Sequence, residues 1–138
     1  MRRSVYIYTM EIEHLAIWVN DIELVKEFYV KYFGMRCNDK YVNPKKQFES
    51  YFLSFDERGA RVEIMRRPDI TPGNSPHSTM MGLTHFAISA GTKEKVDELT
   101  ETLRADGYTV AGEPRLTGDG YYESVVLDPE GNYVEITV

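Results

Sequence analysis

Two histidines and two glutamates recur in this sequence with nearly one period. His14 begins the stretch HLAI, and His85 begins the similar stretch HFAI 71 positions later. Glu63 and Glu135 are the centres of two Val-Glu-Ile triplets that lie 72 positions apart. Each half of the chain therefore carries one His and one Glu, separated by 49 or 50 positions. Self-similarity at a period of half the chain indicates an internal duplication.

These four side chains together have the chemistry of a metal site. Imidazole nitrogen and carboxylate oxygen suit a divalent transition metal, and we expect Ni, Co or Zn, with Mn or Fe as alternatives. In an extended strand the Val and Ile beside Glu63 point away from it, and the same holds around Glu135. Two buried carboxylates are costly unless a cation binds them. The alternative, in which His14 and His85 are hydrogen-bonded packing residues, stays open.

The residues that surround these positions predict the elements that carry them. Alternating apolar positions around His14 predict a strand, and apolar positions at helical spacing after it predict a helix. The second half repeats this order. We predict strands at 12–19, 49–55, 60–65, 83–89, 120–127 and 133–138, weaker strands near 36–42 and 108–112, and helices at 20–34 and 92–107. The predicted class is α+β, with two tandem βαβββ modules that form a curved mixed sheet.

Capping residues mark the ends of the two predicted helices. Asn20 is a suitable N-cap for the first helix, with Glu23 placed three residues later, and Gly34 ends it. Thr92 is a suitable N-cap for the second helix, and Gly107 ends it.

One compact domain is predicted over residues 10–138. It consists of a module at 10–67 and a module at 82–138, joined by a linker at 68–81 that is rich in proline and glycine. His77 lies in this linker and is interpreted as a solvated loop residue. Residues 1–9 are interpreted as an N-terminal extension, whose role the sequence does not define.

Composition excludes several classes of partner. The chain has 16 basic and 22 acidic residues and a formal charge of −6, which argues against nucleic acid or an anionic membrane as a partner. No apolar run is long enough to span a bilayer. Cys37 is the single cysteine, which favours a reducing, cytoplasmic location and an apolar filling role rather than a nucleophilic one.

These motifs resemble those of the vicinal-oxygen-chelate superfamily, also called the glyoxalase/bleomycin-resistance/dioxygenase group. The resemblance covers residues 10–138 and rests on the stretches HLAIWVND, FYVKYFGM, VEI, GLTHFAI and LDPEGNYVEI. The pattern is most similar to the glyoxalase I (lactoylglutathione lyase) type, whose metal ligands are His, Glu, His and Glu in this order. By resemblance these ligands are His14, Glu63, His85 and Glu135.

The resemblance also implies a reaction. In glyoxalase I a metal holds the two oxygens of a hemithioacetal, formed from methylglyoxal and a thiol, and a carboxylate moves a proton between neighbouring carbons through an enediolate. A nearby cation and a carboxylate in reach suit this chemistry. By resemblance, Glu135 is the catalytic base, and Glu63 is a ligand that also acts in catalysis. The implied substrate is a small molecule, a thiol adduct of a 2-oxoaldehyde.

Two departures concern the thiol. Bacterial glutathione-dependent members have an Arg four residues after the first His and an Asn four residues after the first Glu, and both help to hold glutathione. Here these positions are Trp18 and Arg67. Trp18 cannot replace an Arg, so the resemblance does not extend to glutathione as the thiol.

Other members of the superfamily supply the alternatives. An epimerase of the methylmalonyl-CoA type usually has Gln where this chain has Glu63, although Glu49 could act as an added base. An Fe(II) dioxygenase or a fosfomycin-resistance thiol transferase would use three ligands. A metal-free binding module, of the bleomycin-binding kind, would lack the ligands altogether. The resemblance implies a homodimer, and the sequence leaves open whether the site closes within one chain or across two.

Overall fold

The computed structural model describes residues 10–73 and 81–138, so the predicted extension 1–9 and His77 lie outside the described residues. The first half contains β1 (His14–Trp18), α1 (Ile22–Phe33), β2 (Arg36–Cys37), β3 (Tyr41–Asn43), β4 (Phe48–Phe55) and β5 (Arg58–Arg66). The second half contains β6 (His85–Ser89), α2 (Lys93–Ala105), β7 (Val110–Leu116), β8 (Tyr122–Leu127) and β9 (Tyr133–Thr137). The predicted α+β class and the repeated module are confirmed.

The strands divide into two sheets, one from each half. The first sheet has the order β1-β5-β4-β2, with β3 paired to β4, and the second has the order β6-β9-β8-β7. In each sheet the first strand of the half pairs in parallel with the last strand of the same half: β1 with β5, and β6 with β9. The sequence alone favoured one curved sheet, whereas among residues 10–73 and 81–138 the strands β1 and β6 each pair on one side and form sheet edges.

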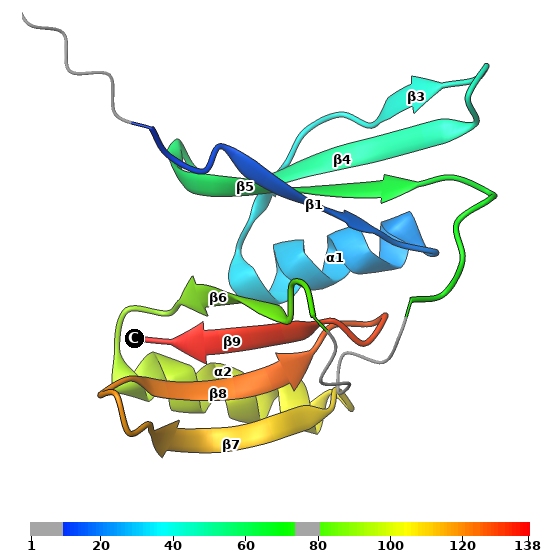
Figure 1. Ribbon diagram of the computed structural model, residues 1–138. Helices are drawn as coiled ribbons and strands as arrows, with labels where there is room; N and C mark the ends of the chain where they lie inside the picture. Colours follow the sequence, from blue (N-terminus) through cyan, green and yellow to red (C-terminus); the bar gives the residue numbers. More distant parts are fainter. Residues whose placement is uncertain (1–9, 74–80) are drawn as a thin grey trace, which may run out of the picture.

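Helix α1 lies between the two halves (Figure 1). Its side chains Val25, Phe28 and Tyr29 are buried. The ring of Phe28 lies 4.9 Å from that of Tyr108, and the ring of Tyr29 lies 6.1 Å from that of Phe86. The apolar spacing that predicts the helix therefore serves both its own sheet and the second half.

The N-terminus of α1 corrects one sequence prediction. The N-cap is Asp21, whose side chain accepts a hydrogen bond from the Leu24 amide, and it is not Asn20. The backbone amides of Asn20 and Asp21 instead donate to the Glu130 carboxylate, which reaches them from the second half at 2.5 and 2.7 Å. A carboxylate at a helix N-terminus is favourable because the amides and the helix dipole face it. A contact 110 residues away in sequence thus displaced the local cap.

The other helix ends agree with prediction. Thr92 caps α2 by accepting from the Lys95 amide, and Gly34 follows α1 with φ +66°. That left-handed backbone conformation favours glycine, because a Cβ would strain it.

A buried carboxylate joins the halves beneath α1. Asp128 is 4% exposed and accepts a 2.8 Å hydrogen bond from the Tyr29 hydroxyl. It also accepts from the backbone amides of Glu130 and Asn132 at 2.9 and 3.0 Å. Burial, then the Asp128 charge, raises the pKa of Tyr29 well above its usual value, so the phenol stays a donor. The turn that ends β8 is therefore held to α1 by satisfied polar contacts.

No helix among the described residues has both the length and the apolar character that crossing a bilayer requires.

Candidate metal-binding site

The first half brings His14 and Glu63 together at a sheet edge. His14 lies on edge strand β1, and Glu63 lies on the adjacent strand β5, opposite Ala16 in the parallel register. The His14 Nε2 atom is 3.8 Å from Glu63 Oε1, while the other ring nitrogen contacts the Glu13 carboxylate. Val62 and Ile64 are buried on the opposite face, as the alternation predicts. We call His14 and Glu63 the first half-site.

The second half repeats this geometry with the same register. His85 lies on edge strand β6, and Glu135 lies on β9 opposite Ala87. The His85 Nε2 atom is 3.0 Å from Glu135 Oε1. Val134 and Ile136 are fully buried on the other face of β9. We call His85 and Glu135 the second half-site.

The donor groups in both half-sites fit a shared cation. The two glutamate side chains are 16% and 17% exposed, and the histidines are 40% and 41% exposed. A nitrogen donor and a carboxylate oxygen therefore face each other at a partly open surface, and such N and O donors suit borderline transition metals.

The structure gathers the four residues into two pairs within one chain. Among residues 10–73 and 81–138, no group of three or more His, Cys, Asp or Glu side chains is placed to hold a metal ion. A pair of donors is about half of what a transition metal usually requires from protein. Each half-site lies beside an edge strand, β1 or β6.

Aromatic rings surround the first half-site on the open face of its sheet. Phe52 pairs with Glu63 in the β4–β5 register, and its ring meets the His14 ring edge-on at 5.3 Å. Trp18 and Phe48 form a second edge-on pair at 6.2 Å. The guanidinium of Arg61 lies over the Phe52 ring at 4.0 Å and pairs with Glu13. This surface is therefore rich in aromatic rings, and the charge of Arg61 beside it is paired with Glu13.

Trp18 and Arg67, the two positions at which the sequence departs from the glutathione-dependent pattern, lie close together in the structure. The Arg67 guanidinium lies 5.8 Å from the centre of the Trp18 ring and forms a bidentate contact with Asp69. That contact raises the pKa of Arg67 and lowers that of Asp69. Arg67 is therefore paired within its own half.

The second half-site opens into a cavity of about 440 Å³. The cavity is bounded by β6, β7, β8 and β9, and its lining includes Gly112, Arg115 and Val125 beside His85 and Glu135. Its volume is within the range of small-molecule sites.

A second acid faces the same surface. Glu123 pairs with Arg115 in the β7–β8 register. Burial raises the pKa of Glu123, and the Glu135 charge adds to this shift, while Arg115 opposes it. The open face of the second sheet therefore concentrates negative charge around a single arginine among the described residues.

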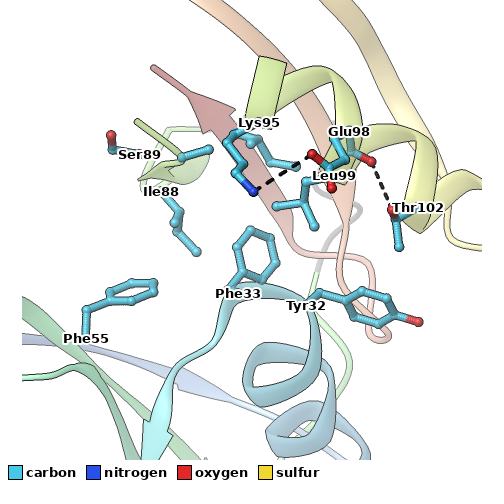
Figure 2. Close-up of a pocket in the computed structure, with 11 residues that line it drawn as sticks. Tyr32, Phe33, Phe55, Ile88, Ser89, Lys95, Glu98, Leu99 and Thr102 are labelled. Carbon is cyan, nitrogen blue, oxygen red and sulfur yellow. Dashed lines mark hydrogen bonds and ion pairs between the residues drawn. The ribbon is translucent and has the colours of Figure 1, made fainter. Parts of the chain in front are cut away.

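A different cavity, of about 430 Å³, lies between the two halves (Figure 2). Figure 2 shows Phe33 and Phe55 of the first half pointing toward Ile88 and Leu99 of the second. Ile88 lies three residues after His85 on β6, so its side chain points to the opposite face of the sheet. This cavity therefore lies on the face opposite the half-sites. Its lining contains no member of either half-site.

Sequence reasoning missed Phe52, Gly112 and Arg115. Phe52 could have been found, because it lies three residues into a predicted strand and alternation places it on the polar face. Gly112 and Arg115 could not, because two register shifts interrupt the alternation of β7. Cys37 is half-buried, and burial raises the pKa of its thiol, which disfavours the reactive thiolate.

Comparison with known proteins agrees with this architecture. The model of the glyoxalase/bleomycin resistance protein/dioxygenase superfamily matches residues 11–136. The chain belongs to this superfamily. The glyoxalase assignment made from sequence motifs is therefore confirmed at the level of the family.

Individual relatives of this glyoxalase-superfamily chain are distant. The uncharacterized protein YqjT of Bacillus subtilis is 28% identical over 133 residues, which cover 89% of this chain and 94% of that protein. The lactoylglutathione lyase of Schizosaccharomyces pombe is also 28% identical, over 72% of this chain, but this match spans only 32% of the yeast protein. At this identity the relatives support the family and do not assign a reaction.

Solved structures of the superfamily share the fold. A glyoxalase family protein from Enterococcus faecalis aligns with TM-score 0.75 and 23% identity, over 93% of this chain and 97% of that one. Glyoxalase I from Zea mays aligns with TM-score 0.73 and 22% identity over 92% of this chain. This chain spans 44% of the maize chain, so the activity of the maize enzyme comes to it only as a proposal.

Proposed function

We propose that this chain is a metal-dependent lyase or isomerase of the glyoxalase I type, which acts on a hemithioacetal of methylglyoxal or a similar 2-oxoaldehyde. The observation that carries the proposal is the repeated pair: His14 with Glu63, and His85 with Glu135, stand in the same register on the same kind of edge. Superfamily membership and the distant lactoylglutathione lyase relative support it.

The complete site is proposed to form across a homodimer. Each half-site supplies two donors, and within the described part of the chain β1 and β6 are edge strands whose backbone groups are open to pairing on one side. In a two-fold dimer, β1 of one chain beside β6 of its partner would join a first half-site to a second one, twice. The same pairing would remove both exposed edges.

The proposed roles follow from the positions of the side chains. His14, Glu63, His85 and Glu135 would hold a divalent metal, with Ni, Co or Zn preferred and Mn or Fe as alternatives. When bound, the metal supplies positive charge that lowers the free energy of negative charge developing on the substrate oxygens. Glu135 moves the proton between adjacent substrate carbons, and its low exposure limits competition from water. His85, at 3.0 Å, orients that carboxylate.

The thiol part of the substrate is proposed to differ from glutathione. Trp18 presents a ring where glutathione-dependent members present a cation, and Arg67 is engaged by Asp69. The rings of Phe48 and Phe52 extend this apolar surface. We also propose a cytoplasmic location, on the ground of the single cysteine.

The test is elemental analysis of untagged protein purified without chelator, together with a His14→Ala/His85→Ala double variant. We expect near-stoichiometric transition metal in the natural protein and loss of it in the variant, with sedimentation showing a dimer for the natural protein. Hemithioacetals of methylglyoxal with several thiols are then assayed. If the protein binds no metal after soaking in Ni, Co, Zn and Mn, the proposal is wrong, and the aromatic surface would support a metal-free binding module.

A further inference from the structure

Arg115 is a cation at the cavity of the second half-site, and the acid opposite it is Glu123. It lies on β7 and lines the cavity with His85 and Glu135. Among the described residues, the Arg115 side chain makes no hydrogen bond or ion pair. Its charge acts on Glu123, which is opposite it in the strand register, by opposing the rise in the pKa of that carboxyl. The other arginines near the half-sites are engaged, since Arg61 pairs with Glu13 and Arg67 with Asp69.

The backbone of β7 directs this side chain over the sheet. Two register shifts occur in the β7–β8 pairing, between Val110 and Gly112 and between Gly112 and Arg115. Such irregularities bend a strand and turn a side chain in a new direction, and they are common beside functional sites. Here the strand also contains Pro114, which cannot donate to the ladder and is tolerated where pairing is irregular.

Gly112 leaves the space that the guanidinium uses. A Cβ added to Gly112 would lie 3.4 Å from Nη1 of Arg115 and 3.3 Å from Cγ2 of Val125. Val125 is opposite Glu135 in the β8–β9 register. The guanidinium therefore lies beside Gly112, at the cavity that Glu135 also lines, and Arg115 remains exposed.

We propose that Arg115 binds a carboxylate on the non-reacting part of the substrate, while the second half-site acts on the carbons beside it. This inference rests on the proposed function and names the substrate class: an adduct that carries one carboxylate. A guanidinium presents two parallel N–H donors that match a carboxylate.

The charges on this face favour a singly charged group. Glu123 and Glu135 both face the same surface as Arg115, and Glu113 in the cavity lining is already paired with Arg104 at 2.5 Å. A phosphate brings nearly two negative charges at neutral pH and would meet more repulsion from the two acids than a carboxylate would. Among the described residues that line this cavity, Arg115 is the one Lys or Arg, and its charge matches one carboxylate.

The test compares two ligands that differ only in charge. The probes are 3-(benzylthio)propionate and its methyl ester, and their dissociation constants are measured by isothermal titration calorimetry on protein purified without chelator. The variants are Arg115→Ala and Arg115→Gln, and the matched control is Arg58→Ala. Arg58 is an exposed strand arginine whose side chain makes no hydrogen bond or ion pair among the described residues and does not line the cavity.

We expect the natural protein and Arg58→Ala to bind the acid about ten-fold or more tightly than the ester. In Arg115→Ala and Arg115→Gln this ratio should fall to about one, with unchanged thermal denaturation because the side chain is exposed. Equal affinity for acid and ester in the natural protein, no binding of either, or a preference that survives in both variants would overturn the inference. Absence of metal or of turnover with an intact Arg115-dependent preference would count against the proposed function alone.

Discussion

The two halves share a scaffold and differ on their open faces. Beside Glu63 the neighbouring strand presents Phe52, whose ring contacts His14, whereas beside Glu135 it presents the smaller Val125. The first face is therefore filled by rings, and the second opens into a cavity that contains Arg115. The two His–Glu pairs are alike in both halves, whereas the residues around them differ and give one aromatic face and one charged face.

The two β-hairpin turns show the same divergence. Both have an Asp followed three residues later by Gly, at Asp56 and Asp128. Asp56 is exposed and pairs with Arg36 at 2.8 Å, while Asp128 is buried and accepts from Tyr29 of the other half. The same local motif is a surface turn in one half and a contact between halves in the other, because only the second lies beneath α1.

The largest expected effect tests whether both donor pairs take part in one site. Glu135→Gln and Glu63→Gln should each lower kcat at least about a hundred-fold, because each removes a carboxylate needed for proton transfer or for holding the metal. The metal content should fall in both. Steady-state kinetics and elemental analysis check this, and full activity in both variants would show that the pairs have a packing role.

The buried turn should matter more for stability than an exposed contact of the same kind. Tyr29→Phe removes the hydroxyl donor of buried Asp128 and should lower the free energy of unfolding by about 2 kcal/mol. The control is Tyr32→Phe, which removes a 2.6 Å contact to Asp106 at the surface and should cost less. Urea denaturation measures both, and equal effects would mean that burial of the Tyr29–Asp128 contact adds no stability.

Exchanging the residues opposite Glu63 and Glu135 should make the open face of each sheet resemble that of the other. Val125→Phe would fill the cavity beside Arg115, and we expect about a ten-fold rise in KM, as for other misfits of a few methylene groups. Phe52→Val would remove the ring against His14 and should change the preference among thiols more than kcat. Michaelis constants for adducts of several thiols test the pair, and an unchanged KM in Val125→Phe would place the substrate elsewhere.

The smallest expected effect concerns acid stability of the first half. A hydrogen bond from Lys40 lowers the pKa of Glu23 from 4.5 to about 2. The lowered pKa in the folded state contributes stability above pH 4.5, and this is lost as the pH falls from 4.5 toward 2. Glu23→Gln should therefore lower the denaturation temperature slightly at pH 7 and less at pH 3. The change in denaturation temperature should be small because the Glu23–Lys40 pair is partly exposed to solvent. A pH-independent difference would mean that Glu23 acts through packing.

Local patterns predicted most elements of the fold. The strands that carry His14, Glu63, His85 and Glu135 follow from alternation and lie where it places them. The N-cap of α1 did not follow, since Glu130 from the other half takes the amide of Asn20. The strand predicted at 108–112 extends to Leu116, because irregular pairing hides its alternation.

The sequence by itself determined the repeat, the module and the strands that carry the two His–Glu pairs, because these depend on spacing along the chain. Only the tertiary structure decided that the two sheets stay separate in one chain and that the half-sites lie on edge strands. It also decided which face carries rings and which carries Arg115. Such features depend on contacts between residues far apart in the chain, where packing and register outweigh any local preference.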